Sequence, residues 1–189
     1  MSRPTFAISA IAGSFTEEAA RQYLADTHQE ADFVYAGTAR GAFAQVAAGK
    51  ADLGIVPIRN SNAGFVLENL YASADYTYKI LEIITISVHQ NLMTLPNVKA
   101  EAITEIVSQL PALAQSSRYL HHHFPNTPQR EYPDTAAAAR DLAAGKLGSA
   151  AAVVAARGAA DRYGLHILKS NIQNDRANYT EFMVFTRHA

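Results

Sequence analysis

Four short polar segments carry the side chains of this chain that could do chemistry, at residues 13–16, 57–64, 110–117 and 171–182. The first reads Gly-Ser-Phe-Thr and stands at a predicted strand-to-helix turn, where backbone N–H groups and the helix dipole favour an anion. A plain helix N-cap explains the same residues equally well. The second, Pro-Ile-Arg-Asn-Ser-Asn-Ala-Gly, closes a predicted strand, which is where α/β proteins place ligands, although it also has ordinary turn chemistry.

The other two segments are rich in side-chain amides. In residues 110–117, Pro111 suits the first turn of a helix, and Gln115 one turn later is either a ligand contact or a solvated helix residue. Residues 171–182 run into the last predicted strand, and their amides ahead of Thr180 indicate either a binding loop or a capped surface loop. Each of the four segments alone is a weak indication of a binding site.

Several other chemistries are excluded or disfavoured. The chain has no Cys, which excludes disulfides, a thiol nucleophile and zinc-thiolate or iron–sulfur sites. The run His121-His122-His123 cannot turn three rings to one ion from a helix, so no metal site is expected. The Gly-x-Ser-x-Gly elbow, the Gly-x-Gly-x-x-Gly fingerprint and the P-loop pattern are absent.

Composition describes a globular, soluble protein. The chain has 189 residues, of which 49% are apolar, and its formal net charge of −1 gives no reason to expect nucleic acid or an anionic membrane as partner. No apolar run approaches the roughly 18 residues that span a bilayer, and residues 1–11 lack a convincing signal peptide. We therefore expect a cytoplasmic protein.

The elements that must position these residues follow an α/β pattern. Predicted strands at residues 5–11, 32–36 and 53–58 alternate with helices, which argues for a largely parallel sheet. The second half repeats this order, and Ala-Ala-Gly-Lys ends a predicted helix at both 47–50 and 143–146. We expect one domain, 1–189, with two similar lobes and a ligand cleft between them. Lobe 1 comprises about residues 1–80 and 177–189, and lobe 2 about residues 81–176.

Taken in order, these segments resemble the prephenate dehydratase family. The family's Gly-Thr-Phe-Ser-like turn and Pro-Ile-Glu-Asn-Ser…Gly loop match residues 13–16 and 57–64. Its His-x-Leu, its Ser-His-Pro-Gln-Ala-Leu-Ala-Gln-Cys stretch and its Thr-Ala-x-Ala-Ala helix match residues 89–92, 108–116 and 135–139. Tyr-Gly-Leu and Asn-x-Thr-Arg-Phe match residues 163–165 and 178–182. The resemblance covers nearly the whole chain.

The resemblance implies a fold of the type II periplasmic binding protein class and a cofactor-free reaction that turns prephenate into phenylpyruvate, water and CO₂. It implies Thr180 as the hydrogen-bond donor to the departing hydroxyl, with Asn60 and Gln115 as further catalytic contacts. The substrate, an anionic carboxylic acid, would be bound by Ser14, Phe15, Arg59, Ser61, Thr135, Asn178, Glu181 and Phe182. It also implies a homodimer.

Two departures from the family's motifs bear on the substrate. The family's Glu-Asn-Ser is Arg59-Asn60-Ser61 here, and its Thr-Arg-Phe is Thr180-Glu181-Phe182. The lost arginine is the family's expected carboxylate anchor, and glutamate does not replace a bidentate guanidinium. Because the changes have opposite sign, we hypothesise that Arg59 and Glu181 form a reversed ion pair across the cleft.

These departures leave three functions open. The favoured one is a lyase of specialised metabolism, such as one of tropone or tropodithietic acid (antibiotic) biosynthesis or a non-aromatising prephenate decarboxylase. The second is a genuine prephenate dehydratase of phenylalanine biosynthesis, and the third a non-catalytic small-molecule binding protein. The sequence shows no C-terminal ACT domain, so feedback inhibition by phenylalanine is not expected.

Overall fold

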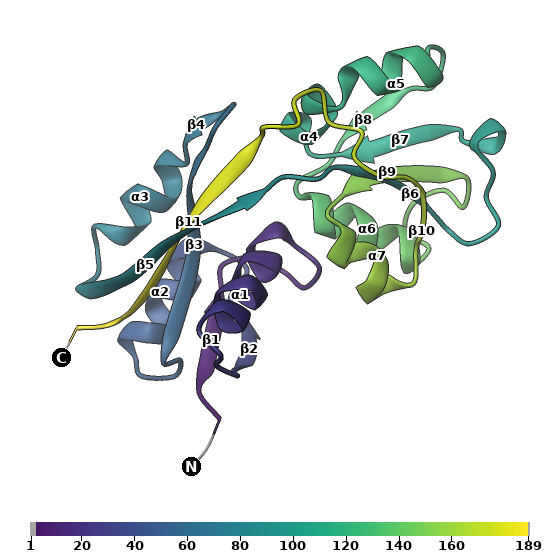
Figure 1. Cartoon of the computed structure of the whole chain (residues 1–189). Helices are drawn as coiled ribbons and strands as arrows, with labels where there is room; N and C mark the ends of the chain where they lie inside the picture. The colour runs from purple at the N-terminus through teal and green to yellow at the C-terminus, as the bar shows by residue number, and fades with distance from the viewer. Residues whose placement is uncertain (1–2, 189) are drawn as a thin grey trace. The chain divides into compact units, whose positions relative to one another are not determined.

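Two sheets, each with its own core, organise the chain (Figure 1). The structure is a computed structural model that describes residues 3–188. Unit 1 consists of the residues up to Ile11, Phe15–Ser87 and those from Asn178 on, and unit 2 of Ala12–Ser14 and Val88–Ala177. Within the described residues, no helix is both long enough and apolar enough to cross a bilayer.

Unit 1 contains a mixed six-stranded sheet in the described part of the chain, with the order β2-β1-β3-β11-β5 and β4 paired to β3. The strands are β1 (Thr5–Ile8), β2 (Asp32–Tyr35), β3 (Leu53–Asn60), β4 (Gly64–Phe65), β5 (Tyr78–Ser87) and β11 (Tyr179–Arg187). Its helices are α1 (Phe15–Asp26), α2 (Ala39–Ala47) and α3 (Leu67–Ser73). Only β2, β1 and β3 run parallel. The prediction of a largely parallel sheet is wrong here, because β11 runs antiparallel to both β3 and β5.

Strand β11 supplies both cores of unit 1. Phe182 and Val184 pack on one face of the sheet with residues of α1, whereas Met183 and Phe185 pack on the other face with residues of α2. Successive strand residues point to opposite faces, so this alternation fixes the register of β11.

Unit 2 contains a five-stranded sheet in the described residues, with the order β10-β6-β9-β7-β8. The strands are β6 (Asn91–Thr94), β7 (Glu105–Ser108), β8 (Gln129–Glu131), β9 (Ala151–Ala155) and β10 (His166–Lys169). The helices are α4 (Leu110–Gln115), α5 (Ser117–His123), α6 (Thr135–Ala143) and α7 (Arg157–Tyr163), with a 3₁₀ turn η1 at Ala100–Ala102. Strand β9 is buried throughout.

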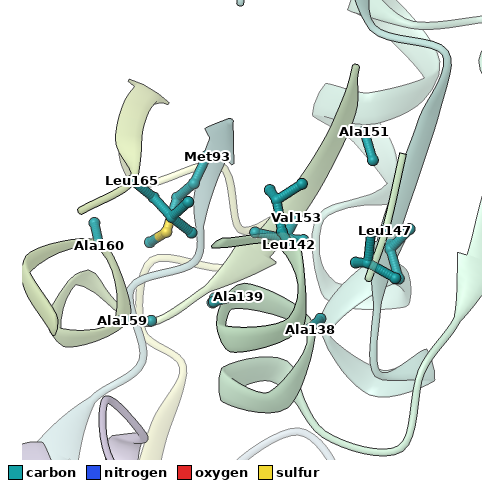
Figure 2. Packing of buried hydrophobic residues seen from close by; sticks show 12 residues of the cluster. Met93, Ala138, Ala139, Leu142, Leu147, Ala151, Val153, Ala159, Ala160 and Leu165 are labelled. Carbon is teal, nitrogen blue, oxygen red and sulfur yellow. The ribbon is translucent and has the colours of Figure 1, made fainter. Parts of the chain in front are cut away.

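The main core of unit 2 combines a few large side chains with many alanines (Figure 2). Met93, Leu142, Val153 and Leu165 fill the space between the sheet and α6 and α7. The helices contribute alanines at their contact faces, and small side chains let helices approach a sheet closely. The Ala-rich composition thus serves helix formation and packing together.

The repeated Ala-Ala-Gly-Lys ends two helices in the same way. After α2, the N–H of Gly49 donates to Val46 O and that of Lys50 to Gln45 O. After α6, Gly145 donates to the carbonyl of Leu142 and Lys146 to that of Asp141. This is the Schellman arrangement, in which the glycine adopts a left-handed backbone, and φ is 67° at Gly49 and 71° at Gly145. The prediction of glycine helix ends is confirmed.

Candidate functional site

Asn60 and Thr180 are directly paired residues at the ends of β3 and β11 in unit 1. Asn60 Nδ2 donates to Thr180 Oγ1 at 3.0 Å. The orientation of the Asn60 amide is set by its oxygen, because Oδ1 accepts the backbone N–H groups of Asn62 and Ala63, both at 3.0 Å. The turn after β3 therefore aims the amide nitrogen at the threonine hydroxyl.

Ser61 and Asn178 brace this pair. Asn178 Oδ1 accepts from Asn60 Nδ2 at 2.8 Å and from Ser61 Oγ at 3.2 Å. The two chain segments are also joined by main-chain bonds, because Ser61 N–H donates to Tyr179 O and Tyr179 N–H donates to Ser61 Oγ. Asn178 is only 1% exposed. It supports Asn60 from within the unit, and its expected role in substrate binding stays a prediction.

This neutral network prepares Thr180 to donate a proton or hydrogen bond. Its oxygen accepts from Asn60, so its own O–H is directed to a different acceptor. The residue is half-buried. A hydroxyl held in this way can assist the departure of an oxygen leaving group.

Arg59 and Glu181 form the ion pair that the sequence suggested, but in a different place. Arg59 Nη1 lies 3.2 Å from Glu181 Oε1, and the two residues are directly paired on β3 and β11. The expectation that the pair would bridge two walls of a cleft is therefore wrong, because both residues belong to one sheet.

The ion pair also lies on the opposite face of the sheet from Thr180. Thr180 pairs with Ile86 and shares its face with Phe182, in the core beneath α1. Glu181 shares its face with Met183, on the side of α2. Adjacent strand residues point to opposite faces, so Arg59 and Glu181 are directed to the other face than Thr180, and their expected roles in substrate binding stay predictions. The pair is a cross-strand link beside the site.

The two expected aromatic contacts belong to the core of unit 1. Phe182 is 1% exposed and packs among the buried residues beneath α1. Phe15, the first residue of α1, packs against the same cluster. Phe182 therefore serves in packing here, and its expected role in substrate binding stays a prediction.

Gln115 is the last residue of α4 and belongs to a group of amides in unit 2. Its Oε1 accepts from Gln90 Nε2 at 3.2 Å. The backbone N–H of Gln90 donates to Gln173 Oε1 at 3.1 Å, and Gln173 Nε2 lies 3.3 Å from His89 Nδ1. Sequence reasoning flagged the amide-rich loop but not Gln90. The only signal for Gln90 was its place between His89 and β6.

The turn that carries Ser14 is tightly packed within unit 2. Gly13 has a φ of 82°, and a Cβ there would lie 2.9 Å from the Cα of Ala159 in α7. Tyr163 donates from its hydroxyl to Ala12 O at 2.8 Å. Ser14 is buried and directly precedes α1. Only glycine combines the left-handed backbone with this close approach, so the turn positions Ser14 rigidly.

Thr135 begins α6 and is also buried. Asp134 caps this helix by accepting the N–H of Ala137 at 2.8 Å. Within α6, Asp141 accepts from Arg140, Tyr132 and Lys146. The guanidinium of Arg140, with Tyr132 and Lys146, holds the pKa of Asp141 well below its usual range, although burial opposes this. The same hydrogen bond to Asp141 raises the pKa of Tyr132.

The three consecutive histidines are the last three residues of α5 and belong to neither of the two hydrogen-bonded amide groups described above. His123 packs against Tyr119, with ring centroids 4.4 Å apart and ring planes at 36° to each other. Both line a surface pocket of about 450 Å³ with residues of η1 and the loop after α5. Across residues 3–188, no three His, Asp or Glu side chains gather as metal ligands would.

A sequence model of the family described as prephenate dehydratase matches residues 7–189. The chain belongs to the prephenate dehydratase family. The family's expected fold is confirmed by a prephenate dehydratase from Arthrobacter aurescens, solved in complex with L-Phe. The two chains are 28% identical in sequence, and their structures have a TM-score of 0.87. The match covers 98% of this chain and 61% of the Arthrobacter aurescens chain. The fold is thus α/β of the type II periplasmic binding protein class.

Curated relatives in the prephenate dehydratase family carry two substrate names. Arogenate dehydratase 5 of Arabidopsis thaliana is 38% identical over 137 residues, which is 72% of this chain and 32% of that protein. The bifunctional chorismate mutase/prephenate dehydratase of Neisseria gonorrhoeae is 31% identical over 176 residues, 93% of this chain and 48% of that protein. The chain thus spans about a third to a half of these relatives.

Proposed function

We propose that this domain is a carbon–oxygen lyase that acts on a prephenate-type cyclohexadienol. The observation that carries the proposal is the hydrogen bond from Asn60 Nδ2 to Thr180 Oγ1. It leaves the threonine proton for a ring hydroxyl of the substrate.

The dehydration requires mainly a hydrogen-bond donor at the departing oxygen of the substrate. In the dehydration of prephenate, the bond between the ring and its carboxylate breaks to release CO₂, and its electron pair enters the ring. The ring C–O bond breaks at the same time, and the departing oxygen takes up a proton to leave as water. A neutral donor at that oxygen lowers the barrier, because negative charge develops there. Thr180 has this role, and we carry Gln115 over from the family's motif as a further substrate contact.

The reversed charges at Arg59 and Glu181 bear on a diverged role. Arg59 and Glu181 neutralise each other, so the pair adds no net charge beside Thr180. Relatives named for prephenate or arogenate differ in whether the substrate's side chain carries a keto or an amino group. The departure from the family's Thr-Arg-Phe motif at Glu181 is our reason to propose a changed substrate within this chemistry, and hence the lyase of specialised metabolism, although Glu181 points to the face opposite Thr180.

The test is turnover of prephenate and arogenate by the purified protein, followed by NMR. Three variants accompany the wild type: Thr180→Val, Thr180→Ser and, as a control away from the network, Thr186→Val. We expect Thr180→Val to lose about 10²–10⁴ in kcat/KM, because it keeps the shape but lacks the donor. Thr180→Ser retains the hydroxyl and should keep most activity.

Each outcome selects one function. An aromatic product with loss of activity in Thr180→Val indicates dehydration, and the better substrate shows whether an amino or a keto group is preferred. A non-aromatic product indicates decarboxylation alone. Binding of either compound without turnover would contradict the enzyme and favour a binding protein. No interaction with either would place the substrate in another class.

We also propose a cytoplasmic homodimer that forms through the outer edge of β5. Among the described strands β5 pairs with β11 alone, and Ile80, Leu81 and Ile83 are 49%, 41% and 52% exposed. A long apolar edge is a template for another strand. Lys79 and Glu82 lie on this strand, so antiparallel pairing of two copies lets each lysine meet a glutamate. Light scattering should give a dimer for the wild type and a monomer for Ile83→Lys, and a monomeric wild type would contradict the proposal.

A further inference from the structure

A buried glutamine stands beside Gln115 in unit 2. Gln90 directly precedes β6, is 3% exposed, and donates from Nε2 to Gln115 Oε1 at 3.2 Å. We propose that Gln90 is a positioning residue that fixes the orientation of the Gln115 amide, so that Gln115 presents its Nε2 donors to the substrate. The proposal rests on the proposed function in one respect: Gln115 must contact the substrate.

The main chain of Gln90 is held in place by the loop after β10. Gln90 N–H donates to Gln173 Oε1 at 3.1 Å, and its carbonyl accepts from Ile172 N–H at 2.9 Å. Asn91, the next residue, donates from its side chain to His89 O and Ala155 O. Because the main chain of Gln90 and the adjoining Asn91 are held by these hydrogen bonds, the Cα of Gln90 has a fixed position.

The same loop holds Gln115. The N–H of Asn174 donates to Gln115 O. The Asn174 side chain donates to Ala114 O and Ser117 Oγ, both at 3.0 Å, and accepts from Arg118 N–H at 2.9 Å. The segment from Ile172 to Asn174 therefore ties the backbones of both glutamines together and sets the distance between their side chains.

The hydrogen bond between the amides gives Gln115 one orientation. Because its Oε1 accepts from Gln90, its Nε2 must lie on the other side of the amide plane. A carboxamide has two nearly isosteric orientations, and only a fixed partner distinguishes them. Gln90 is such a partner, since its burial leaves its side chain few alternative positions.

A second observation argues against a merely structural role for Gln90. Its own Oε1 is buried and accepts no hydrogen bond from any residue of the range 3–188. An unpaired buried carbonyl destabilises the fold, and an apolar side chain of similar size would avoid this. Gln90 therefore orients the Gln115 amide while its own unpaired carbonyl lowers the stability of the fold.

This opposition between stability and activity provides the test. We expect Gln90→Met to unfold at the same or a higher temperature than the wild type, while kcat for the active substrate falls roughly tenfold to a hundredfold. Gln90→Leu is the second variant, should methionine pack poorly. Gln109→Met, at an exposed position before α4, is the matched control and should leave both quantities unchanged.

A measurement on the free protein separates this proposal from the proposed function. The side-chain NH₂ resonances of Gln115, identified by their loss in Gln115→Leu, should shift and exchange faster with solvent in Gln90→Met. This result is expected even if neither substrate is turned over, an outcome that would defeat the proposed function alone. Unchanged Gln115 resonances would overturn the role of Gln90. So would a loss of kcat that is matched by a loss of thermal stability.

Discussion

Asn60 Nδ2 lies 3.0 Å from Thr180 Oγ1, although 120 residues separate the two in the chain. The amide is fixed by the turn that follows β3, and the hydroxyl by the first residues of β11. Since an amide nitrogen only donates, Thr180 must use its own proton elsewhere. The donor character of this threonine is therefore a property of the pair.

Asn60→Asp should reverse this relationship. A carboxylate would face Asn178 Oδ1, Tyr179 O and Thr180 Oγ1 with no proton to give, and it would accept the threonine proton. We expect a loss of about 1–3 kcal/mol in the free energy of unfolding at neutral pH, measured with urea. Turnover should fall as it does in Thr180→Val.

The pH dependence of this variant checks the cause. Burial among acceptors raises the folded-state pKa of the new carboxyl above its unfolded value of about 3.9. The stability gap to the wild type should therefore be largest above the folded pKa and narrow as the pH falls toward about 4. A gap that does not vary with pH would contradict repulsion between acceptors.

The ion pair of Arg59 and Glu181 should contribute little to the free energy of unfolding, but the coupling energy between the two side chains should be measurable. With side chains 40% and 25% exposed, a double-mutant cycle should give a coupling energy of about 0.5–1 kcal/mol, which decreases with added salt. The swap Arg59→Glu with Glu181→Arg should regain most of it, because the residues are direct cross-strand neighbours. If the charge swap restored none of the coupling energy, Arg59 and Glu181 would not form an ion pair in solution.

Asp141 should stabilise unit 2 in a pH-dependent way. Its folded-state pKa lies below the unfolded value because of Arg140, Tyr132 and Lys146. Its contribution is therefore fully present above about pH 4 and is lost as the pH falls below that value. Asp141→Asn should cost about 1.5–3 kcal/mol at pH 7 and progressively less below pH 4, by urea unfolding. The exposed Asp161→Asn on α7 is the control, and an equal effect there would refute the assignment.

Gly13→Ala should be costly because two penalties combine. The left-handed backbone costs about 1–2 kcal/mol for alanine, and the approach to Ala159 at 2.9 Å adds about 1–3 kcal/mol of overpacking. Gly64→Ala has a similar φ of 81° but nothing within 4 Å, so it measures the backbone penalty alone. Gly148→Ala has neither and should unfold like the wild type. Equal losses at Gly13 and Gly64 would exclude the packing contribution.

Much of the secondary structure could be predicted because its causes are local. Helices α2 and α6 are closed just beyond their last residues, at Gly49 and Gly145. The closing hydrogen bonds lie within six residues, so the repeated Ala-Ala-Gly-Lys suffices to identify both ends. Pro111 at the start of α4 is a similar case. The mixed direction of the first sheet could not be predicted in this way, because β11 pairs with strands about a hundred residues earlier.

By itself, the sequence determined the family and the side chains that carry its motifs, Asn60, Gln115 and Thr180 among them. Residue types and their order are enough for that. Only the tertiary structure decided that Glu181 turns away from Thr180 to pair with Arg59, and that Gln90 fixes Gln115. The physical reason is that strand register assigns each side chain to a face, and buried hydrogen bonds between distant residues exist only once that register is set.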